Sequence, residues 1–169
     1  MRKGRGREKA LWNEMDNNCM YCDKGEQLQR VMLPVCEIGG FPLYLMKNQT
    51  YRGRVVLACD EHIGTIAGME DEKSVNFFRA VQKTASILTE VFHPGQVNIG
   101  MYADKMNHLH CHITPKYPGG PDWGGTFQMD PQPPVLLSYE EYEVMIQKIT
   151  NEAAKQEKAG KIRGDSGCL

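Results

Sequence analysis

Three of the chain's five histidines alternate with other residues in one short run, His108-Leu109-His110-Cys111-His112. Side chains on a β-strand point alternately to its two faces, so a strand here places all three imidazoles on one face and Leu109 and Cys111 on the other. Imidazole has the side-chain pKa closest to neutrality, which lets it act as a nucleophile, a proton carrier or a metal ligand. The run therefore predicts a sheet that covers a core on one side and holds a reactive site on the other.

The composition is that of one compact domain. A chain of 169 residues, 41% of them hydrophobic and 24% charged, is long enough to bury a sizeable core. The formal net charge of -1 predicts no general attraction to nucleic acid or to an anionic membrane, so neither is an expected partner. The six cysteines accompany no export signal and no transmembrane segment. This favours reduced thiols or metal ligands over disulfides, and hence a cytoplasmic protein.

Both ends of the chain are polar and glycine-containing. Residues 1–16 are basic and lack an apolar block, so we expect a flexible N-terminus rather than a signal peptide. A single domain should span residues 17–153. Residues 154–169 are charged and should form a loose tail.

Five short apolar segments favour strands. Runs rich in β-branched and aromatic residues predict strands at 31–35, 41–46 and 55–58. Two further strands, at 96–102 and 108–114, are separated by a polar turn and should form a hairpin. The histidine run lies in the second strand of this hairpin.

Two longer segments favour helices. Apolar residues recur every three or four positions over 72–92, which predicts a helix ended by Pro94-Gly95, with a buried stripe made of Val75, Phe78, Val81, Ala85, Leu88 and Phe92. Ser138 and Glu141 form a capping box that opens the last helix. Between them, residues 118–134 are rich in proline and glycine and should form an ordered surface loop.

A second motif near the start concerns metal binding. Cys19 and Cys22 are separated by two residues, a spacing that lets two thiolates reach one ion from a tight turn. Such a pair supplies half of a tetrahedral zinc site.

Residues 108–116, with three alternating histidines followed by Pro115-Lys116, resemble the motif of the histidine-triad family of nucleotide hydrolases and transferases. That motif usually ends in Pro-Arg. The resemblance extends upstream to the glycine-led segment 53–58 and to the asparagine-containing segment 98–104, and it covers about residues 19–149.

The resemblance implies an α+β fold, with an antiparallel sheet of about five strands, two main helices and a two-fold homodimer. It also implies a hydrolase in which His110 attacks the α-phosphorus of a nucleotide derivative and forms a nucleotidyl-histidine intermediate. Water then releases a nucleoside monophosphate. Chemistry supports this role, because a neutral imidazole attacks phosphorus without first losing a proton. His112 faces the same space and can donate a hydrogen bond to a phosphoryl oxygen.

Further site residues follow from the same resemblance. Asn98 is expected to hold the phosphate or the leaving group. Asp104 stands where the family has a phosphate-contacting turn, although its carboxylate repels phosphate unless it is protonated or turned away. Asn48 is either a ribose contact or a turn residue. Lys116 keeps the charge of the usual arginine but not its bidentate fork.

The chain resembles the zinc-containing branch of the family, which is similar to diadenosine polyphosphate hydrolases and binds its metal through a cysteine pair and two histidines. The matching residues here are Cys19, Cys22, His62 and His108. Two thiolates and two imidazoles form a closed tetrahedral set, which implies a structural zinc. Magnesium would assist only by shielding a polyphosphate substrate.

Several readings of the function remain open at this point. The substrate is either a dinucleoside polyphosphate or a nucleoside phosphoramidate, and the same chemistry with another acceptor gives a nucleotidyltransferase. Alternatively, His108, His110 and His112 bind one catalytic metal, because alternate strand positions can supply such ligands. A third possibility is a nucleotide-binding protein with little turnover.

Overall fold

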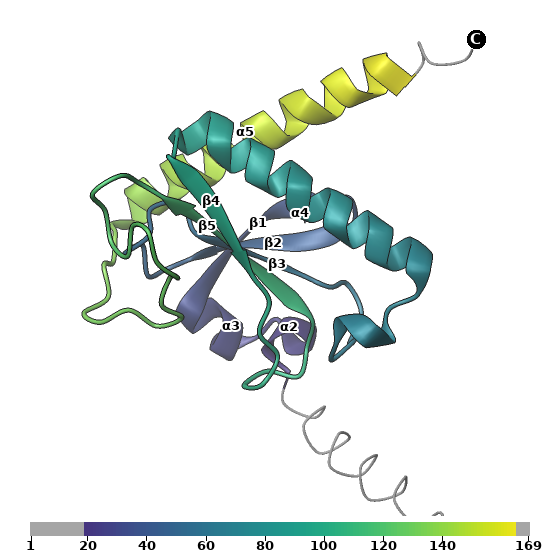
Figure 1. Ribbon diagram of the computed structural model, residues 1–169, viewed down its shortest axis with the longest axis horizontal. Helices are drawn as coiled ribbons and strands as arrows, with labels where there is room; N and C mark the ends of the chain where they lie inside the picture. The colour runs from purple at the N-terminus through teal and green to yellow at the C-terminus, as the bar shows by residue number, and fades with distance from the viewer. Residues whose placement is uncertain (1–18, 165–169) are drawn as a thin grey trace, which may run out of the picture.

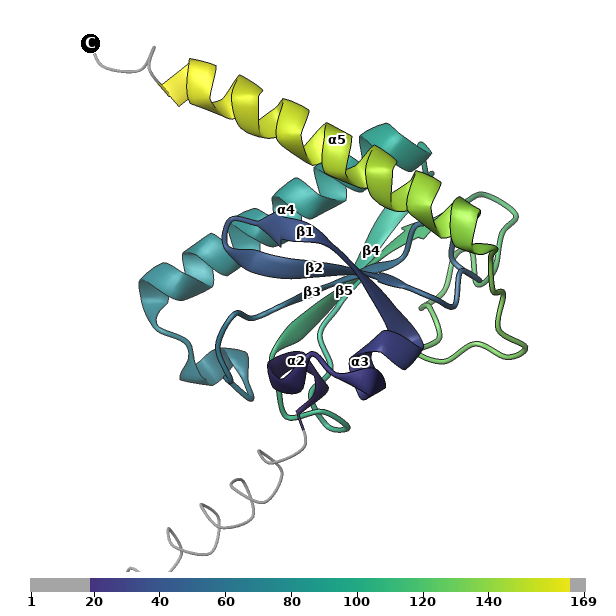
Figure 2. The same ribbon diagram turned by 180° about the vertical axis from the view of Figure 1, so that it is seen from behind.

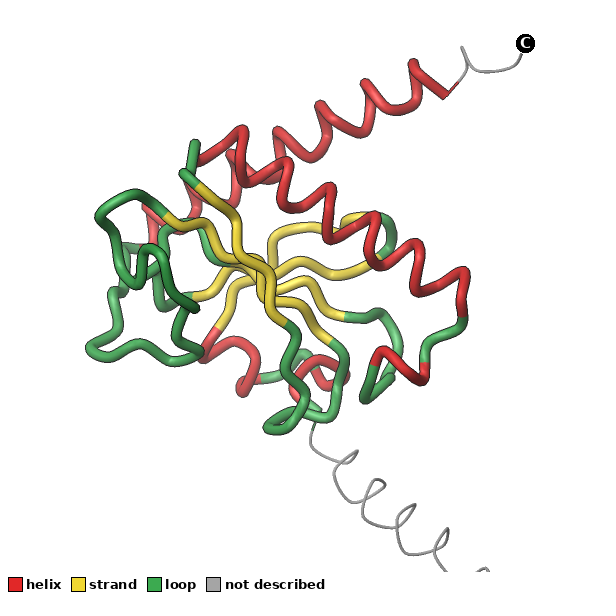
Figure 3. Tube along the Cα trace, viewed as in Figure 1, coloured by secondary structure: helices red, strands yellow, loops and turns green. Residues whose placement is uncertain are grey.

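The computed structural model describes residues 19–164 and contains a single five-stranded sheet with the strand order β1-β2-β3-β5-β4. Every neighbouring pair of strands is antiparallel. The strands comprise β1 (Met32–Ile38), β2 (Phe41–Met46), β3 (Val55–Ala58), β4 (Gln96–Gly100) and β5 (His110–Lys116). With the helices described below, this confirms the predicted α+β fold with an antiparallel sheet of about five strands (Figures 1 and 3).

All five predicted strands are present; those at 41–46 and 55–58 have the predicted bounds, and the other three have shifted ends. The strand predicted at 31–35 extends to Ile38, and the predicted hairpin consists of Gln96–Gly100 paired with His110–Lys116. His108 thus lies just before β5 rather than within it. Gly39 and Gly40 form the turn between β1 and β2 with φ angles of 61° and 88°, which glycine adopts readily.

The long helices α4 (Asp71–Phe92) and α5 (Tyr139–Gly164) cover one face of the sheet, as Figures 1 and 2 show from opposite sides. They enclose the main core with alternate residues of the central strands, among them Val55, Leu57, Cys111 and Ile113. The opposite face carries the short helices α2 (Met20–Asp23) and α3 (Glu26–Val31). A 3-10 helix, η1 (Ile66–Gly68), precedes α4.

The helix predicted at 72–92 is confirmed, but its predicted buried face was partly wrong. Val75 and Phe78 are each 48% exposed. The buried residues of α4 are Phe77, Ala80, Val81, Thr84, Ile87 and Leu88. This stripe keeps the helical spacing of three and four residues but is rotated, because Phe77 packs edge-on against Phe41 of β2.

The last helix begins as predicted and ends later. Glu141 N donates to Ser138 Oγ at 3.2 Å, and Ser138 N donates to Glu141 Oε2 at 2.9 Å, which is the reciprocal capping box. Instead of a loose chain from residue 154, the helix continues to Gly164. Beyond Ala153 it is supported by good helix formers and by local pairs such as Lys155 with Glu152, at 3.0 Å.

The flexible N-terminus predicted for residues 1–16 and the final residues 165–169 lie outside the described part of the chain. Within residues 19–164, no helix is long and apolar enough to cross a membrane.

Candidate active site and metal site

The three histidines of the motif lie side by side at the centre of the sheet, on the face opposite the long helices. His108, His110 and His112 are 2%, 6% and 5% exposed, and Leu109, Cys111 and Ile113 point into the main core. The ring centroids of His110 and His112 are 5.1 Å apart. The alternation predicted from the sequence is therefore confirmed.

The proton on His108 is fixed by a backbone carbonyl. Nε2 of His108 lies 2.9 Å from the carbonyl oxygen of Cys59, an atom that only accepts hydrogen bonds. Nε2 of the neutral ring must therefore carry the proton. Nδ1, with its free lone pair, faces the thiols of Cys19 and Cys22 at 3.3 and 3.6 Å.

His110 has the opposite arrangement. Its Nδ1 donates to the carbonyl oxygen of His108 at 2.7 Å, so the lone pair of the neutral ring lies on Nε2. Burial lowers the pKa of His110 below the ordinary histidine value, and the bond to the His108 carbonyl only partly opposes this effect. At neutral pH, His110 is thus an uncharged ring with a lone pair available on Nε2.

Arg54 determines which ring nitrogen of His112 carries the proton. One guanidinium nitrogen of Arg54 lies 3.1 Å from His112 Nδ1, and because arginine can only donate, Nδ1 must be the acceptor. The proton of His112 is then on Nε2. Burial, followed by the charge of Arg54, lowers the pKa of His112 to about 3. His112 is therefore a neutral hydrogen-bond donor beside a neutral ring with a free lone pair, and chemically such a pair could attack a phosphoryl group.

Tyr21 holds two of these rings in place and was missed in the sequence. Its ring centroid lies 5.0 Å from that of His108 and 5.1 Å from that of His110, with interplanar angles of 34° and 33°. Tyr21 is 4% exposed and lies in α2 between Cys19 and Cys22. Its position within the cysteine motif was the only available signal.

The predicted metal ligands come together from three separate segments. The ligand atoms of Cys19, Cys22, His62 and His108 all lie within 4.8 Å of one another. Cys22 Sγ is 3.2 Å from His62 Nδ1, and Cys19 Sγ is 3.3 Å from His108 Nδ1. In a tetrahedral zinc site with bonds of about 2.3 Å to sulfur and about 2.0 Å to nitrogen, such atoms are about 3.5 Å apart. The four residues therefore fit zinc, and the unprotonated Nδ1 of His108 points the right way.

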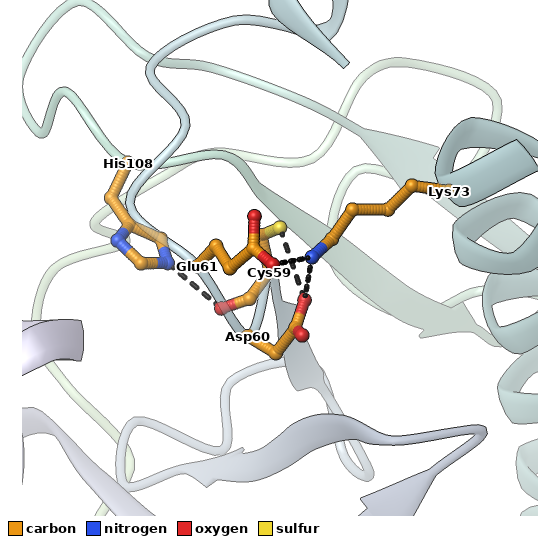
Figure 4. Close-up of polar contacts among 5 residues, drawn as sticks. All are labelled: Cys59, Asp60, Glu61, Lys73 and His108. Atoms are coloured by element: carbon orange, nitrogen blue, oxygen red, sulfur yellow. Dashed lines mark hydrogen bonds and ion pairs between the residues drawn. The ribbon is translucent and has the colours of Figure 1, made fainter. Parts of the chain in front are cut away.

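Lys73 of helix α4 binds the segment that follows β3, residues 59–62, which contains His62 (Figure 4). Lys73 Nζ lies 2.8 Å from a carboxylate oxygen of Asp60 and 2.8 Å from one of Glu61. These two acidic residues separate His62 from Cys59, whose carbonyl orients His108. The ion pairs thus hold one candidate metal ligand, His62, and the carbonyl group that orients another, His108.

Proteins of known structure share this architecture. A histidine triad protein from Sinorhizobium meliloti matches with a TM-score of 0.69 over 76% of this chain and 94% of its own, at 19% identity. One from Marinobacter aquaeolei gives 0.68, with 78% and 95% covered, at 21% identity. The chain has the histidine-triad fold. A Zn-bound histidine triad family protein from Mycobacterium smegmatis also has it, with a TM-score of 0.61 over 84% of this chain and 97% of its own, at 18% identity.

Sequence comparison gives one relative of note. An uncharacterized HIT-like protein from Methanocaldococcus jannaschii is 30% identical over 80 residues, which make up 45% of this chain and 62% of that protein. The match thus spans less than two thirds of the relative. No protein-family model matches the chain.

In this histidine-triad fold, a long segment, residues 117–137, lies against the histidine face at Arg54 and His112 and is called the cover loop. Phe127 of the loop lies 6.4 Å from the His112 ring, centroid to centroid. Polar side chains of the sheet region bind its backbone: Arg54 donates to the carbonyls of Gln128 and Met129 at 3.0 and 3.2 Å. The loop is ordered, as its sequence predicted.

Three other residues fasten the cover loop. Lys116 is 3% exposed and donates to the carbonyls of Asp122 and Gly125, while the Tyr51 hydroxyl is bonded to the Asp122 carboxylate. Asn48 Nδ2 donates to the Pro131 carbonyl at 2.9 Å, and its Oδ1 accepts from Val135 N at 3.1 Å. Lys116 and Asn48 therefore have structural partners in the loop.

The remaining predicted site residues lie farther from His110. Asn98 pairs with Thr114 on β5, two residues beyond His112, and lines a pocket of about 330 Å³ together with Lys116 and Trp123. His110 lines a smaller pocket of about 150 Å³ with residues that include Thr65, Met101 and Tyr102. Asp104 is exposed in the connection between β4 and β5. The structure thus brings Asn98 to the histidine face and leaves Asp104 in solvent.

Proposed function

We propose that this chain is a member of the histidine-triad family and a hydrolase that cleaves nucleotide derivatives at the α-phosphate. The observation that supports this best is the pairing of an unprotonated His110 Nε2 with the protonated Nε2 of His112 on one face of the sheet. One ring offers a lone pair and the next offers a donor. Both are needed for displacement at a phosphoryl centre.

In the proposed first step, the His110 Nε2 lone pair attacks the α-phosphorus. The P–N bond forms as the bond from phosphorus to the leaving group breaks, and the bonding electrons depart with that group. A phosphate leaves as its anion, whereas the amine of a phosphoramidate takes a proton from solvent as it leaves. Meanwhile, the Nδ1–H of His110 keeps its bond to the His108 carbonyl, which stabilises the positive charge that develops on the ring. His112 donates to a phosphoryl oxygen through Nε2.

In the second step, water attacks the phosphorus of the nucleotidyl-histidine and the P–N bond breaks. The electrons return to His110 Nε2, the proton of the water passes to solvent, and a nucleoside monophosphate is released. We propose a dinucleoside polyphosphate, such as a diadenosine polyphosphate, or a nucleoside phosphoramidate as the substrate. With another acceptor in place of water, the same intermediate gives a nucleotidyltransferase.

The proposal includes a structural zinc held by Cys19, Cys22, His62 and His108. When bound, zinc would crosslink α2, the segment after β3 and the start of β5. In the described part of the chain, the cluster that could hold a metal includes His108 but neither His110 nor His112. This arrangement favours phosphoryl chemistry over a catalytic metal bound by all three histidines.

Substrate contacts and assembly belong to the same proposal. We assign Asn98 to the phosphate or leaving group, and Asn48 and Asp104 remain proposed substrate contacts, with Asn48 the weaker one because the cover loop already engages its amide. Magnesium would shield a polyphosphate substrate. A homodimer in the cytoplasm completes the proposal.

A substrate panel tests the function. Purified protein is mixed with diadenosine polyphosphates and with adenosine phosphoramidates, and release of AMP is followed by chromatography. We expect turnover by the wild type, none by His110→Ala, and a trapped adduct with the mass of one nucleotidyl group in rapidly quenched samples. A wild type that neither turns over nor gains mass would exclude the hydrolase, and product formed only with an added acceptor would indicate a transferase.

A further inference from the structure

Arg54 is a fully buried cation on the histidine face. It is 1% exposed and lies immediately before β3, in phase with Val56 and Ala58, which face the same side. Gly53 precedes it in a left-handed turn, and Met46 N donates to the Arg54 carbonyl at 3.1 Å, which extends the β2–β3 pairing to this residue. The sheet itself therefore fixes the position of the guanidinium.

The partners of Arg54 are all uncharged. The guanidinium donates to two carbonyls of the cover loop and to His112, and it lies 5.0 Å from the ring centroid of Phe127 and 5.9 Å from that of Tyr51. Among the residues described, no carboxylate forms an ion pair with it. Burial lowers the pKa of Arg54 to about 10, which still leaves it charged at neutral pH. The carboxylate of Asp130 acts on this charge, but from beyond ion-pair distance. A buried charge without a hydrogen-bonded counter-ion is costly, so this one favours an anion beside it.

Two hydrogen-bond donors in the same pair of side chains are also unused. Arg54 Nε and His112 Nε2 are buried and have no partner among the described residues. Both carry protons, the first because arginine is always a donor and the second because His112 Nδ1 accepts from Arg54. One positive charge and two N–H donors thus lie in side chains that touch each other.

We propose that Arg54 is the positioning residue of this site: it holds His112 as the Nε2–H tautomer and supplies the positive charge that offsets the charge of the phosphoryl group. The inference rests on the proposed function. It follows that His112 acts as a neutral donor, since a doubly protonated ring has no acceptor for the arginine. The charge that a protonated histidine would otherwise bring comes from Arg54.

Few other groups near His112 can affect its protonation. Within residues 19–164, the titratable or charged groups that face it are Arg54, before β3, and His110, on β5. The neighbouring position on β4 is Gly100, and the cover loop presents Phe127. A change in the protonation of His112 after substitution of Arg54 is therefore attributable to Arg54.

The test needs a control, because Arg54 also holds the cover loop. Lys116 is that control: it is a buried cation bonded to two carbonyls of the same loop, and no described hydrogen bond joins it to a histidine. Arg54→Met removes the donor and the charge, and Arg54→Lys keeps the charge without the fork. Lys116→Met removes a buried charge and a loop anchor but no hydrogen bond to a histidine. Folding of each variant is checked by its amide NMR spectrum.

The first readout is nitrogen-15 NMR of the imidazoles in the full-length, zinc-loaded protein. In the wild type and in Lys116→Met, His112 should show a protonated Nε2 and an unprotonated Nδ1 without titrating between pH 8 and about pH 5. In Arg54→Met, it should titrate closer to the ordinary value of about 6.5. An unchanged tautomer and titration in a folded Arg54→Met protein would overturn the proposal. Arg54→Lys should give an intermediate result if Arg54→Met does not fold.

The second readout is binding and turnover. Arg54→Met should weaken AMP binding at least tenfold, because the positive charge is lost. It should lower kcat by up to roughly 10²- to 10³-fold, the usual cost of losing one donor to a developing oxyanion, because His112 Nε2–H is no longer held as that donor. AMP affinity equal to that of the wild type would overturn the role of the charge. If the wild type hydrolyses no substrate of the panel, the proposed hydrolase fails, while the NMR spectra and AMP binding still decide the role of Arg54.

Discussion

The carbonyl oxygen of His108 accepts a hydrogen bond from Nδ1 of His110 at 2.7 Å. One residue thus presents its ring to the proposed zinc and its backbone to the proposed nucleophile. The position of the metal site and the protonation of His110 are therefore linked through one residue, His108. Loss of zinc should lower the rate of the reaction as well as the stability of the fold.

Metal removal tests this link. Cys22→Ser should abolish zinc binding and lower kcat, because the segment that positions His108 loses a crosslink. Its free energy of unfolding should fall by about 4 kcal/mol in free zinc at ~1,000 times the Kd of the wild type. Metal analysis and urea unfolding are the measurements. Cys36→Ser, which changes a half-buried thiol outside the cluster, should keep one zinc per chain, and so should His110→Ala. Zinc lost in His110→Ala would contradict the proposed ligand set.

The ion pairs of Lys73 give a second prediction. Lys73→Met should weaken zinc binding by roughly 10- to 100-fold, since the segment at 59–62 loses its tie to α4. Competition with a zinc-binding dye measures the affinity. Lys155→Met removes the exposed pair with Glu152 on α5 and should leave zinc affinity unchanged. Equal affinities in the two variants would show that the Lys73 pairs do not support the metal site.

The lowered pKa of His112 predicts a dependence of stability on pH. Between the unfolded pKa near 6.5 and the folded pKa of about 3, the unfolded chain binds a proton that the folded chain excludes. The free energy of unfolding should therefore fall with decreasing pH in that window, with a contribution from His112 of up to about 1.4 kcal/mol per pH unit.

His112→Asn separates this contribution from those of other groups. Asparagine offers Arg54 an acceptor but does not titrate. The unfolding free energy of the His112→Asn protein should therefore fall less steeply with decreasing pH than that of the wild type. Urea unfolding of both proteins at several pH values measures the difference. Parallel curves for the two proteins would mean that His112 is not kept neutral by the fold.

Gly53 offers a matched test of the turn that carries Arg54. Its φ is 86°, and a Cβ there would lie 2.7 Å from the ring of Phe92. Gly40 has a similar φ of 88°, but a Cβ added there would have no atom of a non-neighbouring residue within 4 Å. Gly40→Ala should thus cost about 1–2 kcal/mol from backbone strain alone, and Gly53→Ala should cost more. Thermal unfolding and kcat of the two variants are the measurements. Only Gly53→Ala should also lower kcat, and an equal loss of stability in Gly53→Ala and Gly40→Ala would exclude the clash with Phe92.

The sequence predicted the strands, the shared face of the histidines and the cysteine pair because those depend on alternation and on short motifs. His62 and His108 joined the predicted metal cluster only through the family resemblance. It did not predict which faces of α4 are buried, because the stripe depends on where Phe77 meets Phe41. Tyr21 and Arg54 were missed for a related reason. Each reaches the histidines only through pairings between segments distant in the chain, as with Arg54 and His112, 58 residues apart. The protons on the three rings likewise depend on partners supplied by the folded backbone.

The cover loop is held from below by Asn48, Tyr51, Arg54 and Lys116, two of which are buried cations. Lifting it as a flap would break several hydrogen bonds at once and separate these cations from their acceptors. We therefore expect the loop to act as a fixed wall during turnover. Substrate and product should then enter and leave at the start of β5, through the small pocket that His110 lines with Thr65, Met101 and Tyr102.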